Sequence, residues 1–119
     1  MWNSSRRWPE VGQYRPNAYT LTLRLIGNKW KILIIQRLLD RPYRFNELCR
    51  SIDGLSEKVL ADNLKQLECD GIITRTVYPE VPVRVEYALS DVGDSMCPII
   101  ASMQEWGLGY QEKVREESV

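Results

Sequence analysis

One stretch of this 119-residue chain carries side chains of clear chemical capacity, spaced to share a face of an expected helix over residues 56–70. An ammonium group donates hydrogen bonds to phosphate oxygens or base edges, a carboxylate can accept from cytosine, and an alanine can contact the thymine methyl. Lys65 could instead pair with Asp62 or Glu68 on the same helix. The candidate nucleic-acid contacts on this face are Ser56, Glu57, Lys58, Ala61, Asp62 and Lys65.

A second group of cations lies outside this helix and could position a duplex through its phosphates. Arg84 follows a loop with two prolines, from which it could enter a minor groove or contact phosphate. An alternative stays open, because Arg84 could pair with Glu80 or Glu86 instead. The candidates in this second group are Lys29, Lys31, Arg44, Arg50 and Arg84.

Other kinds of chemistry are poorly represented. The chain has no histidine, which removes the usual general base and the commonest metal ligand. Its cysteines, Cys49, Cys69 and Cys97, form no CxxC pair, and no glycine-rich phosphate loop is present. Cys69 is expected at an exposed helix end with no strong cation near it. We therefore expect no enzyme activity, no metal and no cofactor, and the sequence names no effector.

The location suggested by the sequence is the cytoplasm. Three widely spaced cysteines fit reduced thiols in a cytosolic protein. The pair Arg6–Arg7 is not followed by the apolar stretch of an export signal. Apolar runs such as residues 32–35 are far too short to span a bilayer, so we expect no membrane contact.

Charge is distributed unevenly although the net charge is zero. Residues 1–65 hold twelve Lys and Arg against six Asp and Glu, whereas residues 66–119 hold four against ten. The asymmetry favours a basic working surface on one part and an acidic, solvated remainder, with accidental clustering as the alternative.

The elements that must position these residues follow from hydrophobic periodicity. Spacings of three and four predict helices from Asn17 to the Gly27–Asn28 break, and from there to Arg41–Pro42. A short helix is expected over residues 45–52, and the next helix is capped by Ser56 and ends at Gly71.

After Gly71 the period changes to two, which is typical of strands. Residues 73–78 and 83–89 alternate around a loop containing two prolines and predict a β-hairpin. Ser90 is expected to cap one last helix with an apolar stripe. We expect an irregular arm at residues 1–16, a domain with its terminal helices at residues 17–112, and a tail at residues 113–119.

This order of elements predicts a mainly α fold with a small β-hairpin wing, that is, a winged helix-turn-helix. Several stretches strongly resemble the HxlR-type family of bacterial transcriptional regulators, over about residues 16–110. They are residues 25–31 (LIGNKWK), residues 44–48 (RFNEL), residues 67–75, and residues 77–87 (VYPEVPVRVEY). The resemblance implies a dimeric DNA-binding protein whose additional N- and C-terminal helices build the dimer.

Two positions depart from the family pattern. Relatives often have a cysteine directly before the proline at the start of the first helix, where this chain has Arg15, so a thiol sensor at that position cannot be carried over. Relatives also often have Thr and Gln where this chain has Ala61 and Asp62. The acidic residue repels phosphate, and the preferred DNA sequence is therefore expected to differ.

The apolar stripe of the last helix has no obvious partner within so small a domain, and the first helix has a similar surplus. We expect a two-fold interface, with a last helix that folds back over its own domain as the alternative. The expected interface residues are Leu21, Leu25, Ile99, Ile100, Met103, Trp106 and Tyr110.

Two functions of different classes fit these features. The first is a homodimeric regulator that binds double-stranded DNA at a pseudo-palindromic operator, with recognition helices about 34 Å apart. The alternative is a winged-helix module that binds protein rather than DNA, which the zero net charge and the acidic residues on the key face keep open.

Overall fold

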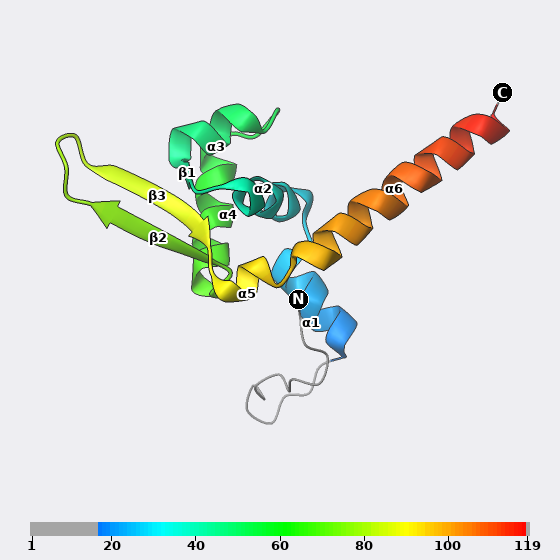
Figure 1. The fold of residues 1–119 in the computed structure, drawn as a ribbon, viewed down its shortest axis with the longest axis horizontal. Coiled ribbons are helices and arrows are strands. Elements are labelled where there is room, and N and C mark those ends of the chain that lie inside the picture. The colour runs from blue at the N-terminus through cyan, green and yellow to red at the C-terminus, as the bar shows by residue number, and fades with distance from the viewer. Residues whose placement is uncertain (1–16, 119) are drawn as a thin grey trace.

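The computed structural model describes residues 17–118, in which a small sheet projects from one side of a group of helices and one long helix extends away on the other side (Figure 1). The described residues span 56 × 44 × 26 Å along the principal axes. In chain order, the elements are α1 (Ala18–Ile26), α2 (Lys29–Asp40), β1 (Tyr43–Arg44), α3 (Phe45–Ser51), α4 (Glu57–Cys69), β2 (Ile73–Tyr78), β3 (Arg84–Leu89), α5 (Asp91–Asp94) and α6 (Cys97–Glu117).

The helix boundaries have local chemical causes. Asn17, Asn28 and Ser56 each stand before a helix and accept a hydrogen bond from a backbone N–H of its first turn, which satisfies an otherwise unpaired donor. At the end of α4, Gly71 adopts a φ of 75°. There the N–H groups of Gly71 and Ile72 return to carbonyls of the last turn, a closure that favours glycine.

The hydrophobic core lies where α2, α3 and α4 meet the inner end of the sheet. Its fully buried side chains are Ile34, Ile35, Leu48, Leu60, Leu67 and Ile72. Spacings of three and four place the buried residues of α4 on one side of that helix. The core therefore holds α4 by its apolar face and leaves its polar face outward.

The sheet contains one strand more than the sequence predicts. The hairpin of β2 and β3 is present, with Ile73 opposite Leu89 and Tyr78 opposite Arg84. In addition, the two-residue strand β1 pairs with β3, giving the antiparallel order β1-β3-β2. A two-residue strand is too short to show alternation, and its pairing depends on a partner about forty residues away. This strand ties the wing to the helix pair.

The last predicted helix is two helices in the structure. Ser90 caps only the short α5, and α6 begins after Met96. Pro98 lies in the first turn of α6, where the missing N–H is tolerated, and it cannot continue a preceding helix. At the other end α6 runs to Glu117, so most of the expected tail is helical. The expected arm at residues 1–16 lies outside the described residues.

Candidate nucleic-acid interface

α4 brings the first group of candidate residues together on one exposed face. Leu60, Leu64 and Leu67 point into the core from the opposite side of the helix. All six candidates are exposed to solvent: Ser56, Glu57, Lys58, Ala61, Asp62 and Lys65. Position and exposure together make this face available to a large partner.

The N-terminal end of α4 is closed by Ser56, whose Oγ accepts from the backbone N–H of Val59 at 3.1 Å. The Ser56 hydroxyl therefore serves the helix as its cap, as the sequence predicts. The positive end of the helix dipole at this terminus is suited to a phosphate oxygen.

Of the two lysines of α4, Lys58 forms an ion pair and Lys65 forms none among the described residues. Nζ of Lys58 lies 3.0 Å from Oδ2 of Asp62, one helical turn away. Both side chains are exposed, so this pair is screened by water and opens readily. Asp62 is thus occupied by Lys58, and the alternative pairing with Lys65 is not formed among the described residues.

A buried amide positions α4 and was not singled out as functional by the sequence. Asn63 donates from Nδ2 to the carbonyl of Val59 at 2.7 Å. Its Oδ1 accepts from Nδ2 of Asn28 at 3.2 Å, and Asn28 in turn caps α2. A chain of hydrogen bonds therefore links the start of α2 to the middle of α4. An asparagine within an apolar helix face is the sequence signal that marks it.

In the wing, Arg84 pairs with Glu80 and Glu86, which is the alternative to DNA contact that the sequence left open. Its guanidinium donates to Glu80 at 2.8 Å and to Glu86, and it stacks over the Tyr78 ring at 3.8 Å. The side chain is 22% exposed. In the free protein Arg84 holds the wing together through these contacts, and its contact with DNA stays a prediction.

The charges in the wing stabilise one another. Hydrogen bonding from Arg84 lowers the pKa of Glu80, and the two carboxylates raise the pKa of Arg84, Glu80 more than Glu86. The loop beyond them exposes the apolar side chains of Val81 and Val83. The tip of the wing thus offers shape and apolar surface rather than an unpaired cation.

The remaining basic candidates divide into exposed and buried residues. Lys29, Arg44 and Arg50 are exposed, and Nζ of Lys29 lies 4.5 Å from the centre of the Trp30 ring. Lys31 is only 5% exposed, so it offers little surface for the phosphate contact that the sequence predicts. It lies on the side of α2 that faces α1 and α4, where it borders a pocket with Arg24 and Lys65.

The supporting helix α3 begins with an electrostatic cap. Oε1 of Glu47 accepts from the backbone N–H of Arg44 at 2.8 Å and lies 3.5 Å from Nη1 of Arg41. The hydrogen bond from the Arg44 backbone is the main reason that the pKa of Glu47 is lowered, and Arg41 contributes further.

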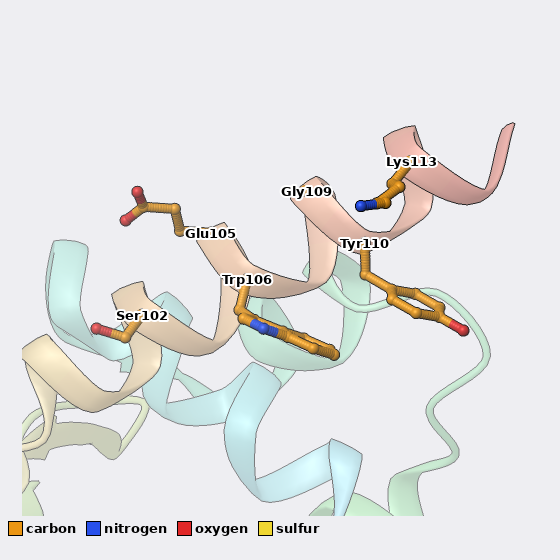
Figure 2. Close-up of a pocket in the computed structure, with 6 residues that line it drawn as sticks. All are labelled: Ser102, Glu105, Trp106, Gly109, Tyr110 and Lys113. Carbon is orange, nitrogen blue, oxygen red and sulfur yellow. The ribbon is translucent and has the colours of Figure 1, made fainter. Parts of the chain in front are cut away.

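The expected interface residues are only partly on the surface. On α6, Ile99, Met103, Trp106 and Tyr110 are exposed, and the last two rings are stacked with centroids 5.4 Å apart (Figure 2). Ile100 is 4% exposed and belongs to the core of the single chain, which corrects its assignment to the interface.

On α1, a different face from the expected one is open. Leu25 packs against the core and Leu21 is half-buried, whereas Tyr19 and Leu23 are the exposed apolar residues. Both pairs have the spacing of one helical turn, so periodicity alone does not select the face that the core takes.

Sites of other kinds do not emerge from the described part of the chain. In residues 17–118, no group of three or more His, Cys, Asp and Glu side chains could hold a metal ion. Among the helices of the same residues, none is both long and apolar enough to cross a membrane. Cys69 is exposed as expected, but the pocket with Arg24, Lys31 and Lys65 corrects the expectation that it has no cation near it.

Comparisons with known proteins agree with this architecture. The model of the HxlR-like helix-turn-helix family matches residues 25–115. An HTH-type transcriptional regulator of Halalkalibacterium halodurans is 46% identical over 100 residues, which cover 83% of this chain and 87% of the relative.

Solved structures of similar proteins have the same fold. The redox regulator HypR in its reduced form superposes with a TM-score of 0.79 at 36% identity, over 84% of this chain and 99% of HypR. The HTH-type transcriptional regulator YtcD gives a TM-score of 0.76 at 37% identity, over 82% of this chain and 99% of YtcD. These relatives are winged-helix transcriptional regulators and not enzymes. With its capped α4, its hairpin wing in a three-stranded sheet and a family match over most of its length, the chain belongs to the HxlR-like helix-turn-helix family.

Proposed function

We propose that the protein is a sequence-specific transcriptional regulator that binds double-stranded DNA in the cytoplasm as a homodimer. The observation that carries the proposal is the outward face of α4, on which every polar candidate is exposed while the opposite leucines are buried. A helix held in this way can enter a major groove without losing its own packing. Lys58 and Ser56 at the N-terminal end are the residues we assign to base and phosphate contact.

The homodimer is supported by the shape of α6. Its 21 residues correspond to a rod of about 31 Å, much of which extends beyond the body (Figure 1). Ile99, Met103, Trp106, Tyr110 and Val114 are exposed at spacings of four, three, four and four, and therefore share one face. An apolar stripe of this kind on an isolated helix is explained by a second copy of the helix.

A two-fold dimer would place two α4 helices on one face of the duplex. The operator would then be a pseudo-palindrome with half-sites about 34 Å apart. Selection from random duplexes, followed by sedimentation of the protein with the selected duplex, tests this arrangement. A monomer of 13.9 kDa that remains monomeric on the selected DNA would contradict it.

Binding to protein instead of DNA is the second candidate, and one observation favours it. Two of the cations assigned to DNA, Lys58 and Arg84, lie in ion pairs with neighbouring carboxylates. Titration with duplex DNA at two salt concentrations separates the candidates, because neutralising phosphates releases counterions and gives a steep salt dependence. If the protein has no measurable affinity for duplex DNA at low salt, binding to protein remains as the proposed function.

Two substitutions on α4, measured in the same titration, test whether its outward face contacts DNA. Lys58→Ala should weaken operator binding by about 1–3 kcal/mol and relax the preference at one position if Lys58 contacts a base. Asp62→Asn releases Lys58 and removes a charge that repels phosphate, so it should strengthen binding to all duplexes. If both variants bind like the wild type, the outward face of α4 is not the contact surface.

A further inference from the structure

An open pocket of about 350 Å³ lies between α1, α2 and α4. Its size is that of a site for a small molecule rather than for a peptide or a duplex. Its borders combine three cationic side chains, one carboxylate, one amide and one thiol: Arg24, Lys31, Lys65, Gln66, Cys69 and Asp70. The three cations outnumber the one carboxylate by two, so the formal charges on the border of the pocket sum to +2.

Lys31 shows that this is more than a cluster of surface lysines. Lys31 as a residue is only 5% exposed, and it borders the pocket. Among the described residues no buried side-chain nitrogen lacks a hydrogen-bond partner, and the Lys31 side chain donates no hydrogen bond there, so its ammonium group keeps contact with solvent and is free to bind an anion. Within the described residues 17–118, neither Lys31 nor Arg24 nor Lys65 forms an ion pair.

We propose that this pocket binds a small organic dianion, a molecule with a phosphate group or a pair of carboxylates. Two negative charges would balance the excess of two cations. The ammonium groups of Lys31 and Lys65 and the guanidinium of Arg24 donate charge-assisted hydrogen bonds to such oxygens. The Gln66 amide adds a neutral donor, and Asp70 can accept from a hydroxyl of the same molecule.

The position of the pocket would let a bound anion change the arrangement of the helices around it. Arg24 belongs to α1, Lys31 to α2 and Lys65 to α4, so one bound molecule would hold three helices together. A ligand that prefers one arrangement of these helices shifts the protein toward it. Control of DNA binding through α4 rests on the proposed function, whereas anion binding does not.

Cys69 provides a direct measurement, because it is an exposed thiol on the border of the pocket. The full chain is alkylated with neutral iodoacetamide at fixed pH, in inorganic phosphate or in succinate, with chloride at equal ionic strength as reference. Modification of each cysteine is followed by mass spectrometry of peptides. The rate at Cys69 should fall in a saturable manner with at least one of the two dianions, to about half when the dianion equals its dissociation constant.

Two internal comparisons make the experiment decisive. Cys97 is exposed and lies outside the pocket, so its alkylation should not respond to either dianion. Arg24→Gln removes one cation at an exposed position and should abolish the protection of Cys69, whereas Arg75→Gln removes an exposed cation of β2 and should leave it intact.

Three results would overturn the inference: no protection by either dianion, equal slowing at Cys69 and Cys97, or full protection in the Arg24→Gln variant. No DNA is present in these measurements. A protein that fails to bind DNA can therefore still show the protected thiol, and the two proposals fail independently.

Discussion

α4 and α6 are both amphipathic helices, but the apolar face of α4 is buried within the chain and most of the apolar face of α6 is exposed. α4 buries Leu60, Leu64 and Leu67 against α2 and the sheet. In α6 only Ile100 is buried, and the apolar residues beyond it face solvent along most of the helix. The contrast is visible in Figure 1, where α4 lies within the body and α6 leaves it.

The difference indicates how each helix is held in place. The orientation of α4 is determined within one protomer, by leucine packing and by the link between Asn63 and Asn28. The outer part of α6 has no comparable support among the described residues, and a helix of this kind is marginal alone in water. We infer that a second chain supports α6, and the following variants test the contrast in order of expected effect.

The largest effect is expected in the core face of α4. Leu60→Ala should lower the free energy of unfolding by about 2–5 kcal/mol, because it leaves a cavity at a fully buried site. Urea denaturation followed by circular dichroism measures the change. Leu108→Ala on α6 is the matched control, since Leu108 is 57% exposed and lies opposite the apolar stripe. Equal losses in the two variants would remove the distinction between the helices.

A substitution on the stripe of α6 should act on association rather than on the fold. Trp106 is 71% exposed in the protomer, so Trp106→Asp leaves the core intact. Buried aromatic residues contribute about 2 kcal/mol or more to interfaces, and the dimer dissociation constant should therefore rise about 30-fold or more. Sedimentation equilibrium over a range of concentrations measures it.

The control for that variant is Leu108→Asp, which places the same charge on the opposite side of α6. It should dimerise like the wild type. If Leu108→Asp dissociates the dimer and Trp106→Asp does not, the interface lies on the other face of the helix.

The asparagine link should have an intermediate effect. Asn63→Ala leaves the Asn28 amide without its partner and should cost about 1–3 kcal/mol in the free energy of unfolding. The neighbouring exposed variant Asp62→Ala should stay within about 0.5 kcal/mol of the wild type. Similar unfolding midpoints for the two variants would show that leucine packing alone orients α4.

The smallest expected effect concerns the free energy of unfolding at acid pH, through Glu47 of α3. Because the pKa of Glu47 is lowered by folding, its stabilising contribution is complete above its unfolded pKa near 4.5 and is lost as pH falls through the lower folded pKa. Glu47→Gln should therefore lose less stability than the wild type over that range. Urea midpoints measured from pH 6 to pH 3 show the difference, and identical midpoint changes in the variant and the wild type would contradict the role of Glu47.

Local residue chemistry already determines most of the elements. Capping side chains such as Ser56, the Gly71 ending of α4 and the alternation of residues 73–89 are signals carried by neighbours in the chain, and the structure agrees with them. The winged-helix class follows from the order of these elements, because each short-range signal points to the same architecture.

Contacts between distant residues decide what the local pattern leaves open. The strand β1 exists because Tyr43 pairs with Tyr87 far along the chain, and Arg84 stacks over Tyr78 because the two residues are partners across the hairpin. Lys31 and Ile100 turn inward because of the helices packed beside them. Helical spacing shows that a face is apolar or charged, but packing selects which neighbour covers it and which side chains remain free to bind.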